Sequence, residues 1–342
     1  MKKYVFFICC SFSMQLYAQT KEVHFLDKRE DKKIDIVVGG RYFSSFIFPS
    51  SLEKPVLYPI QAANGAVVTR GFPLDKRDGE RTDHPHHVGL WFNYESVNGL
   101  DFWNNSYNIP AEKKGKYGWI RNVKILELNK GKSAGRLVYT ANWEKQDGTV
   151  LLIEKTELVF SGTENSRTID RYTTLTAQRD TVHFNDVKDG LLGIRVTKEL
   201  ELPSDKAEKF SDSQGNITEV SPTKNGANGN YLTSAGQTGN AAWGTRGNWC
   251  LLYGIKDQVP VSVAMIDHPK NPGYPTYWHA RDYGLFAANP LGQKIFSEGK
   301  QELRMHLAPG ASVNFRYRVK ISSGTQPTAA SLNAEAADFA RK

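Results

Sequence analysis

Residues 313–321, with the sequence Val-Asn-Phe-Arg-Tyr-Arg-Val-Lys-Ile, decide the fold class. Apolar and polar residues alternate strictly along this stretch, so five apolar side chains face one way and four polar ones the other. Such alternation is typical of a β-strand with one buried face. Residues 303–307 repeat the pattern, and Pro309-Gly310 between the two segments favours a turn. We therefore expect the two segments to form a β-hairpin.

Similar patterns recur along most of the chain. Asp147-Gly148 and Gly39-Gly40 are dipeptides that favour tight hairpin turns, and each separates two segments with strand character. The strands predicted around these turns are residues 135–143 and 149–160, and residues 33–38 and 41–48. The other predicted strands are residues 117–128, 167–177, 191–200, 249–255 and 259–266. Only residues 329–342, rich in Ala, Glu and Asp, have helical character.

Many short strands separated by turns rich in Gly, Pro and Asn are typical of a sandwich or a barrel. In a chain of 342 residues they favour an all-β fold, a large antiparallel β-sandwich with a short C-terminal helix. Residues 204–245 interrupt the alternation and are rich in Gly, Asn, Ser and Thr. A loop of that length is either a functional lid or a solvated insertion, and both interpretations stay open. We predict a single domain, residues 19–342, that contains this long loop.

The first residues predict export. Two lysines precede a short apolar run, and Leu16-Tyr17-Ala18 resembles a signal-peptide cleavage site. The apolar run is too short to span a bilayer. We expect residues 1–18 to be a signal peptide and the mature chain to reside in the periplasm or the cell envelope. The alternative is a lipoprotein anchored through Cys9 or Cys10.

Composition argues against several classes of protein. Only Cys250 follows the signal peptide, so the mature chain is no disulfide-stapled scaffold. The formal charge of +8 becomes +8 − 2 = +6 without Lys2 and Lys3, and the basic residues are scattered. A nucleic-acid-binding protein shows a dense basic stripe, so we expect no nucleic-acid partner. No stretch of ~18 apolar residues follows the signal, so we expect no transmembrane segment.

Histidines cluster at one point of the chain, where His84, His86 and His87 fall within four positions. His84 precedes a proline and is biased towards extended backbone. In an extended segment, His84 and His86 point to one side and His87 to the other. Two neutral imidazoles on one face suit a divalent metal ion, so we predict His84 and His86 as metal ligands. His87 is then free to act as a general acid or base, and histidines that are merely packed are the alternative.

A second polar cluster follows the strand at residues 259–266. His279 and Arg281 lie two residues apart, so they share a face if the segment is extended. An imidazole beside a guanidinium suits a site that moves a proton next to a developing oxyanion. We predict His279 as an acid or base and Arg281 as the group that stabilises the oxyanion. The alternative is a proline-rich turn whose aromatic residues, such as Tyr277, pack against the sandwich.

Several further residues have chemistry suited to a sugar. A few planar hydrogen-bonding groups around an aromatic platform are a common composition for a ligand site. Arg70 lies at a predicted strand end just before the histidines, where it forms either a salt bridge or an anion contact. The predicted substrate-binding residues are Arg70, Asp83, Trp91, Asn93, Asp267, His268, Tyr277 and Asn289.

Four motifs in this order resemble a family of exported bacterial proteins that carries the label "PmoA-like", after a methane monooxygenase subunit. The motifs are Asp83-His84-Pro85-His86-His87-x-Gly89-Leu90-Trp91, Asp267-His268-Pro269-x-Asn271-Pro272, Trp278-His279-x-Arg281-x-Tyr283-Gly284 and Asn289-Pro290-Leu291-Gly292. Members of that family usually have arginine where this chain has Val88, which removes an anion contact from that position. We do not transfer methane oxidation, because such a subunit spans the membrane several times.

The resemblance implies a context and a fold. Such families look like parts of the polysaccharide- and glycoside-processing systems of Bacteroidetes-type bacteria. The fold is similar to the galactose-mutarotase-like supersandwich of aldose epimerases and to the sandwiches of some polysaccharide lyases. Both points are analogies, because a fold does not determine a function.

Three functional hypotheses follow. The first is a carbohydrate-active enzyme that uses a histidine-rich site for general acid/base hydrolysis or elimination on a glycoside or keto-sugar. This chemistry fits the histidines better than the two-carboxylate route of ordinary glycosidases. The second is a non-catalytic carbohydrate-binding protein, which needs aromatic platforms but not the histidines. A structural envelope protein is a third reading.

Overall fold

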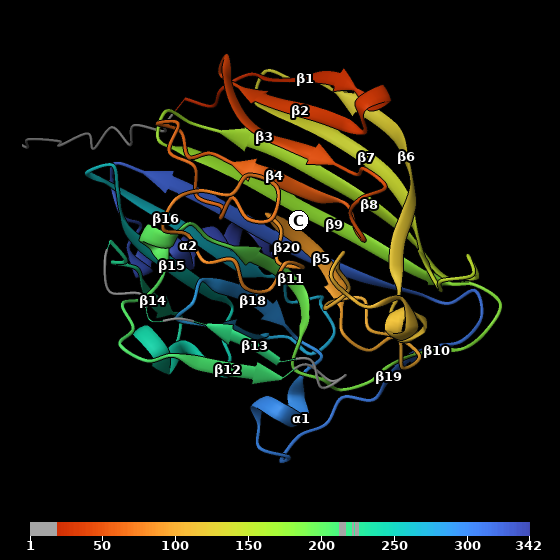
Figure 1. Cartoon of the computed structure of the whole chain (residues 1–342). Coiled ribbons are helices and arrows are strands. Elements are labelled where there is room, and N and C mark those ends of the chain that lie inside the picture. Colours follow the sequence, from red (N-terminus) through yellow and green to blue (C-terminus); the bar gives the residue numbers. More distant parts are fainter. Residues whose placement is uncertain (1–18, 212–216, 221, 223–225) are drawn as a thin grey trace, which may run out of the picture.

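The computed structural model describes residues 19–211, 217–220, 222 and 226–342. The predicted signal peptide, residues 1–18, lies outside the described residues. The described chain forms two large antiparallel β-sheets that pack face to face, with a C-terminal helix behind one of them (Figure 1). This arrangement confirms the predicted all-β antiparallel sandwich.

The first sheet combines strands from both halves of the chain. Its strands are β1 (Val23–Lys28), β2 (Lys33–Val38), β3 (Arg41–Ile47), β4 (Val56–Ile60), β5 (Leu90–Tyr94), β11 (Gly190–Arg195), β17 (Tyr277–Ala280) and β18 (Leu285–Asn289). Their order is β1-β2-β3-β4-β5-β11-β18-β17, and neighbouring strands are antiparallel. Segments that are far apart in the sequence therefore become neighbours at β5, β11, β18 and β17.

The second sheet contains the longest strands. They are β6 (Trp119–Asn129), β7 (Ala134–Glu144), β8 (Val150–Gly162), β9 (Ser166–Ala177), β14 (Asn230–Thr233), β15 (Trp249–Lys256), β16 (Val259–Asp267) and β20 (Ser312–Ser323). Their order is β14-β15-β16-β20-β9-β8-β7-β6. Two short strand pairs lie outside the large sheets, β10 (Val182–Phe184) with β19 (Met305–Leu307) and β12 (Glu208–Ser211) with β13 (Ile217–Val220). The helices are α1 (Gln293–Phe296) and α2 (Ala329–Phe339). The 3-10 turns are η1 (Arg29–Asp31), η2 (Ala111–Lys116), η3 (Lys198–Leu200) and η4 (Gly239–Ala242).

The main hydrophobic core lies between the two sheets. The ring of Phe92 in β5 lies 5.8 Å from that of Phe315 in β20, and the ring of Phe46 in β3 lies 4.6 Å from that of Tyr139 in β7. The apolar residues of the alternating stretch 313–321 supply part of this core. Burial of their faces, at about 25 cal/mol per Å² of apolar surface, is the main force that holds the sheets together.

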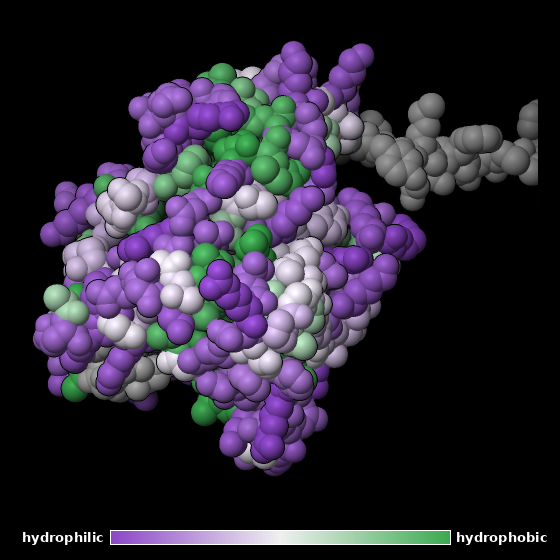
Figure 2. All heavy atoms as spheres, turned by 90° about the vertical axis from the view of Figure 1, so that its right-hand side faces the viewer, coloured by the Kyte–Doolittle hydropathy of each residue, from purple (hydrophilic) through white to green (hydrophobic). Residues whose placement is uncertain are grey.

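The outer faces of the two sheets are covered differently. Helix α2 covers the second sheet, where Phe339 packs in a cluster with Trp249 and Ile266. On the first sheet a separate apolar cluster contains Val56, Tyr58, Val88, Trp91, Trp103, Tyr283, Leu285 and Ala287. Figure 2 shows the molecule from the side of β6, where polar side chains dominate and apolar ones surface in patches between them. The cluster on the first sheet supports the candidate site.

Two predicted hairpins are confirmed, and one is wrong. β7 pairs with β8 and β2 pairs with β3, as the Asp-Gly and Gly-Gly turns predict. In contrast, β20 pairs with β9 and β16, while β19 pairs with β10, so residues 303–321 form no hairpin. Alternation determines which face of a strand is buried, but both edges of β20 are already occupied by other strands.

The segment predicted as a long loop at residues 204–245 contains more regular structure than its composition indicates. It includes β12, β13, β14 and η4, although residues 212–216, 221 and 223–225 lie outside the described part. The predicted C-terminal helix is present as α2. Within the described ranges, no helix is long and apolar enough to cross a membrane.

Candidate functional site

The histidine segment forms a tight turn, so the predicted extended conformation of residues 84–87 is wrong. His84 has a positive φ of 43°, and the backbone N–H of His87 donates to the carbonyl of His84 at 3.0 Å. The buried guanidinium of Arg70 donates to the carbonyls of Asp83 (2.7 Å), His84 (2.9 Å) and His87 (3.2 Å). One fork of donors therefore holds three carbonyls of the turn in place. Arg70 is a positioning residue here.

The turn brings the three imidazoles together instead of pointing them to opposite sides. His84 and His87 stack with ring centroids 4.8 Å apart and planes 6° from parallel, and His86 meets His87 edge-on at 4.3 Å. Behind them, His87 stacks on Trp91 at 5.2 Å, and Trp91 meets Trp103 at 5.1 Å. Trp91, predicted to bind the sugar with its flat face, is instead buried and packs against His87.

Asp83 is the electrostatic centre of the site. One of its oxygens lies 2.8 Å from a guanidinium nitrogen of Arg195, and the other accepts from Arg195 at 3.1 Å. Arg70 approaches the same carboxylate at 3.4 Å, and the Nδ1 of His84 lies 2.5 Å from it. Burial alone raises the pKa of Asp83, but the two guanidiniums and the His84 hydrogen bond hold that pKa well below its usual range. Asp83 is therefore ionised at neutral pH.

These contacts assign a different proton position to each histidine. The Asp83 carboxylate accepts, so Nδ1 of His84 carries the proton and Nε2 is the basic nitrogen. Arg195 only donates, and its guanidinium lies 3.2 Å from Nδ1 of His87, so the proton of His87 is on Nε2. Burial lowers the pKa of His84 to about 4 and that of His87 well below its ordinary value. Nε2 is therefore the unprotonated nitrogen of His84 and the protonated nitrogen of His87. The sequence predicted His87 as an acid or a base, and this proton position suits the acid.

The second predicted motif lies on the same face of the first sheet. His279 pairs with Ala287, Ala287 with Gly193, and Gly193 with Trp91, so the four residues form one row across β17, β18, β11 and β5. Tyr283, in the connection between β17 and β18, stacks on His84 at 5.2 Å with planes 3° from parallel. Tyr283 therefore joins the two motifs in space.

His279 has its own carboxylate partner. Nδ1 of this buried imidazole lies 3.3 Å from Oδ1 of Asp189, within ion-pair distance but off the line of a hydrogen bond. Burial lowers the pKa of His279 well below its ordinary value, and the positive charges of Lys188 and Arg281 add to the effect. His279 is neutral at pH 7, with a carboxylate placed to stabilise its protonated form.

A cleft of about 280 Å³ lies beside the residues that follow His279 in the chain, and Arg281 is one of the residues that line it. The guanidinium of Arg281 lies 5.5 Å from the ring of Tyr283 and 6.0 Å from the ring of Trp243, which is 37% exposed. The cleft is lined by Asn240, Trp243, Ala280, Arg281 and Asp282. It offers an aromatic face and planar polar groups to a ligand.

Several buried nitrogens of the site have no hydrogen-bond partner among the described residues. They are Nε2 of His86, Nε2 of His87, Nε1 of Trp91 and Nε of Arg195. A buried polar atom without a partner costs about 1–3 kcal/mol, and native proteins contain few of them. A cluster of such atoms is typical of a site whose partners belong to a ligand or to bound water.

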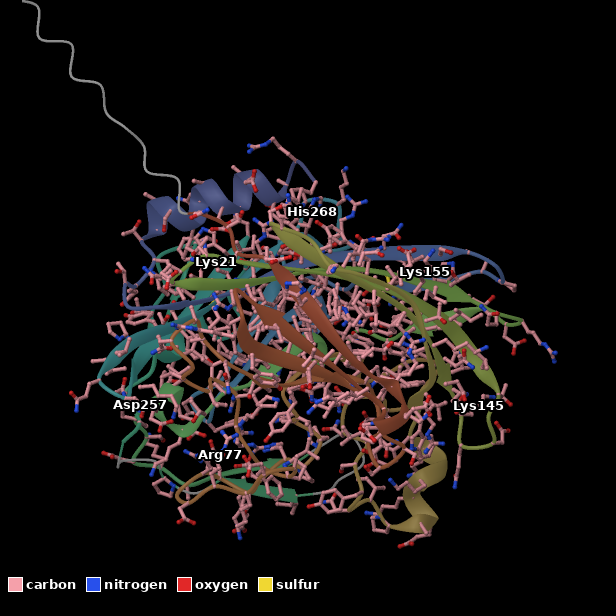
Figure 3. The ribbon with its side chains drawn as sticks, turned by 90° about the horizontal axis from the view of Figure 1, so that it is seen from above. Lys21, Arg77, Lys145, Lys155, Asp257 and His268 are labelled. Carbon is pink, nitrogen blue, oxygen red and sulfur yellow. The ribbon has the colours of Figure 1, made fainter. Side chains whose placement is uncertain are left out.

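Asp267 and His268 lie elsewhere. Asp267 accepts from the backbone N–H of Thr276 at 2.8 Å, which fixes the chain just before β17. His268 packs edge-on against Phe339 of α2 at 5.2 Å. Figure 3 shows His268 beside α2, whereas Arg77, in the loop before His84, lies on the opposite side of the view. The placement gives Asp267 a positioning role and offers no support for substrate binding by His268.

Three other predicted binding residues are occupied by structural contacts. Asn289 donates to the carbonyls of Val187 and Lys188 and accepts from two backbone N–H groups, so it holds a loop. Asn93 donates to the carbonyl of Phe102. Tyr277 stacks on Phe296 at 5.3 Å, which matches the packing alternative. None of these side chains lines the cleft beside Arg281.

The predicted metal site at His84 and His86 is not supported by the donor geometry. Among the described residues, no three or more His, Cys, Asp or Glu side chains are grouped to hold a metal ion. His84 also uses Nδ1 for Asp83.

Sequence reasoning missed four residues of this site, Arg195, Asp189, Tyr283 as a stacking partner, and Trp243. A signal for Arg195 was present, because in residues 191–195, Leu-Leu-Gly-Ile-Arg, it alternates with the core-facing Leu192 and Ile194. Buried charge on a strand normally has a partner. Trp243 lies in residues 204–245, which we predicted as a loop from their composition, and so its place in the cleft lining was not expected.

Residues 33–337 match the model of a protein family that is described as a family of unknown function, DUF6807. Because the match covers most of the chain, this protein belongs to that family. The match does not test the resemblance to PmoA-like proteins. No curated protein matches the chain.

Solved structures with a similar fold include sugar-related proteins at low identity. A putative aldose 1-epimerase from Klebsiella pneumoniae subsp. pneumoniae is 12% identical, with a TM-score of 0.40 over 92% of this chain and 86% of that one. A galactose mutarotase-like protein from Clostridium acetobutylicum is 12% identical, with a TM-score of 0.38 over 89% and 98%. The galactosidase domain of an alpha-galactosidase-sucrose kinase is 10% identical with a TM-score of 0.38 over 88% of this chain, which spans only 41% of that one. The likeness concerns the fold alone.

Proposed function

We propose that this protein is an exported enzyme that acts on a glycoside or keto-sugar by moving a proton at the Asp83–His84 pair. The observation that carries the proposal is the position of Tyr283, whose ring stacks on His84 of this pair and lies 5.5 Å from the guanidinium of Arg281. An aspartate that fixes one nitrogen of an imidazole leaves the other nitrogen basic and stabilises the imidazolium that forms. The same arrangement is a frequent device for general acid/base catalysis.

The proposed reaction begins on a carbon next to a carbonyl group. His84 removes the proton with Nε2, and the electron pair moves onto the carbonyl oxygen, where the guanidinium of Arg281 balances the negative charge. The enolate then expels the glycosidic oxygen, which takes the proton back from His84. No oxidant or metal is consumed. Hydrolysis by the same pair, with water as the nucleophile and His279 as the second acid/base group, is the alternative route.

The cleft beside Arg281 supports a sugar as substrate. A partly exposed tryptophan, Trp243, offers the flat apolar face on which pyranose rings stack, and Asn240 and Asp282 offer hydrogen bonds to hydroxyl groups. This composition is common in small-molecule sites. Residence in the periplasm or the envelope follows from the predicted signal peptide and belongs to the same proposal.

The test compares substitutions of the pair with a matched histidine elsewhere. Turnover is measured on a panel of glycosides and keto-glycosides by mass spectrometry, and binding of the best substrate by calorimetry. We expect His84→Gln to lower kcat at least 100-fold with little change in binding, and Asp83→Asn to lower it at least as much. His306→Asn, at an exposed histidine of β19, is the control and should retain full turnover.

Two outcomes would overturn the proposal. One is a wild-type protein that binds a glycan from the panel without converting it, which would favour the non-catalytic binding protein. The other is unchanged turnover in His84→Gln, which would remove the proton transfer from this pair. Circular dichroism of each variant confirms that the sandwich is intact.

A further inference from the structure

A second and larger cleft lies between β6 and the connection from β3 to β4, and none of the histidines lines it. Its volume is about 580 Å³, which is within the usual range for ligand sites. The residues that line it are Lys32, Phe48, Pro49, Ser50, Leu52, Lys54, Pro55, Ile120, Arg121, Asn122, Val123 and Lys124. We call it the lysine cleft.

The charge of the lysine cleft is one-sided. Its lining contains four cationic side chains and no carboxylate. Lys32 and Lys124 are exposed and form no ion pair within the described ranges, and Arg121 lies over the ring of Trp119 at 4.6 Å. Like charges in one concave surface repel one another, and a cleft concentrates their field on whatever enters it. An anion in the cleft relieves this repulsion.

Two carboxylates that lie close to the cleft, Glu144 and Glu53, contact other side chains. Glu144 accepts from the side chain of Asn122 at 2.9 Å, and Glu53 lies 3.9 Å from the ammonium of Lys114. Lys54, the buried cation of the cleft, donates to the carbonyl of His86 at 2.8 Å instead of to an acid. Glu144 and Glu53 act on Arg121 and Lys54 from outside the lining, whereas the lining itself supplies four cationic side chains and no carboxylate, so positive charge is in excess within the cleft.

The shape of the cleft is built into β6. The register between β6 and β7 shifts between Arg121 and Lys124, and Asn122 at the shift has a positive φ of 57°. Such bulges redirect side chains and are typical features of strands next to functional sites. Asparagine is one of the few residues that adopts this backbone conformation at low cost. The bulge brings Arg121 and Lys124 into the lining of one cleft.

We propose that the lysine cleft is a second ligand site that binds an acidic oligosaccharide. Its carboxylate or sulfate groups contact Lys32, Arg121 and Lys124, and the apolar face of a sugar ring lies on Leu52 and Val123. The choice of a sugar as the carrier of the anionic groups rests on the proposed function, whereas the preference for anions rests on the cleft alone.

One residue of the lysine cleft, Lys54, also contacts the candidate active site. The ammonium of Lys54 lies 5.6 Å from the ring of Trp91, on which His87 stacks, and it binds the carbonyl of His86. An anionic group in the lysine cleft therefore lies next to the cation that supports the histidine turn. The two sites are adjacent but have separate linings, so each can be altered independently.

The test uses calorimetry on the full mature chain with four probes, namely trigalacturonate, a sulfated chondroitin tetrasaccharide, neutral maltotriose and a ten-base DNA single strand. The variant Lys32→Gln/Arg121→Gln/Lys124→Gln removes three charges from the cleft. The control Lys132→Gln/Arg179→Gln/Lys270→Gln removes three exposed charges elsewhere. The two acidic sugars distinguish carboxylate from sulfate as the preferred anion.

We expect at least one acidic sugar to bind the wild type, and the cleft variant to bind it at least tenfold more weakly, while the control variant matches the wild type. Added salt should weaken this binding, because the contacts are exposed. Maltotriose that binds equally well, DNA that binds as tightly as the sugars, or an unaffected cleft variant would each overturn the proposal. Repeating the titration with His84→Gln separates the two proposals, since that variant should keep the acidic sugar whether or not the protein is an enzyme.

Discussion

Two buried clusters of charged side chains invite comparison, one between the sheets and one on the outer face of the first sheet. In the core cluster, Arg171 pairs with Glu154 at 2.6 Å. The two oxygens of Glu154 also accept from Tyr139, Thr156 and the indole N–H of Trp143. The carboxylate is thus surrounded by donors from its own fold.

The outer cluster differs in its ratio of cations to carboxylates and in its open hydrogen-bonding atoms. Asp83 faces the guanidiniums of both Arg70 and Arg195, and the imidazoles packed around it keep nitrogens without partners. Cations outnumber the carboxylate at its centre, whereas the core cluster pairs one with one. A group that serves only stability has its hydrogen bonds completed by the fold, and a group that serves a ligand leaves some of them open. The comparison therefore distinguishes a charge cluster whose hydrogen bonds the fold completes from one that keeps open positions, and the second is the cluster for which we propose a function.

The sharpest test of the comparison is Glu154→Leu. This change leaves the guanidinium of Arg171 buried without its carboxylate, and we expect a loss of about 3–5 kcal/mol in the free energy of unfolding. The double variant Glu154→Leu/Arg171→Met should recover most of it. Urea unfolding followed by tryptophan fluorescence measures both, and Glu127→Leu, which breaks an exposed pair with Arg136, should cost below about 1 kcal/mol. A single variant as stable as the wild type would show that the core cluster is not structural.

The outer cluster should make stability depend on pH. The pKa of His84 falls from 6.5 to about 4 on folding, because burial disfavours the charged imidazolium. The positive charges of Arg195 and Arg70 lower the pKa further, and the Asp83 carboxylate offsets only part of the shift. Its stabilisation is complete above pH 6.5 and is lost as the pH falls towards 4, which amounts to about 3 kcal/mol for this residue alone. Urea unfolding at pH 7 and pH 5 measures the loss.

The variant His84→Gln identifies the source of this pH dependence. It should lose less stability than the wild type between pH 7 and pH 5, because one fewer buried neutral imidazole takes up a proton on unfolding. The buried His86, His87 and His279 have lowered pKa values as well and supply the remaining dependence. Equal losses in the wild type and the variant would contradict the assignment to His84.

The smallest expected effect concerns Gly193, which packs against the two tryptophans beneath the outer cluster, Trp91 and Trp103. A Cβ at Gly193 would lie 2.7 Å from an atom of Trp91 and 2.8 Å from one of Trp103, so Gly193→Ala displaces the rings that support His87. We expect a cost of about 1–3 kcal/mol and a shift in tryptophan fluorescence. Gly115→Ala is the control, since the nearest atom to its Cβ lies 3.8 Å away, and its stability should match the wild type. Unchanged fluorescence in Gly193→Ala would mean that Trp91 and Trp103 accommodate the added methyl group without moving.

Local patterns predicted much of the fold because they depend on neighbouring residues alone. The alternation of residues 313–321 correctly identified a strand with one face in the core, and Asp147-Gly148 correctly identified the hairpin of β7 and β8. The pairing of β20 with β9 and β16 depends instead on which strand edges the rest of the chain leaves open. No local pattern contains that information.

The sequence by itself determined the all-β sandwich, the clustering of histidines and the presence of His279 and Arg281 in one short motif. Only the tertiary structure decided that His84 pairs with Asp83, that Tyr283 joins the two motifs, and that His268 faces α2 instead. The physical reason is that strand character follows from adjacent residues, whereas the position of a proton on an imidazole follows from side-chain contacts that only the folded chain sets. For His87 that partner is Arg195, more than a hundred positions away, at 3.2 Å.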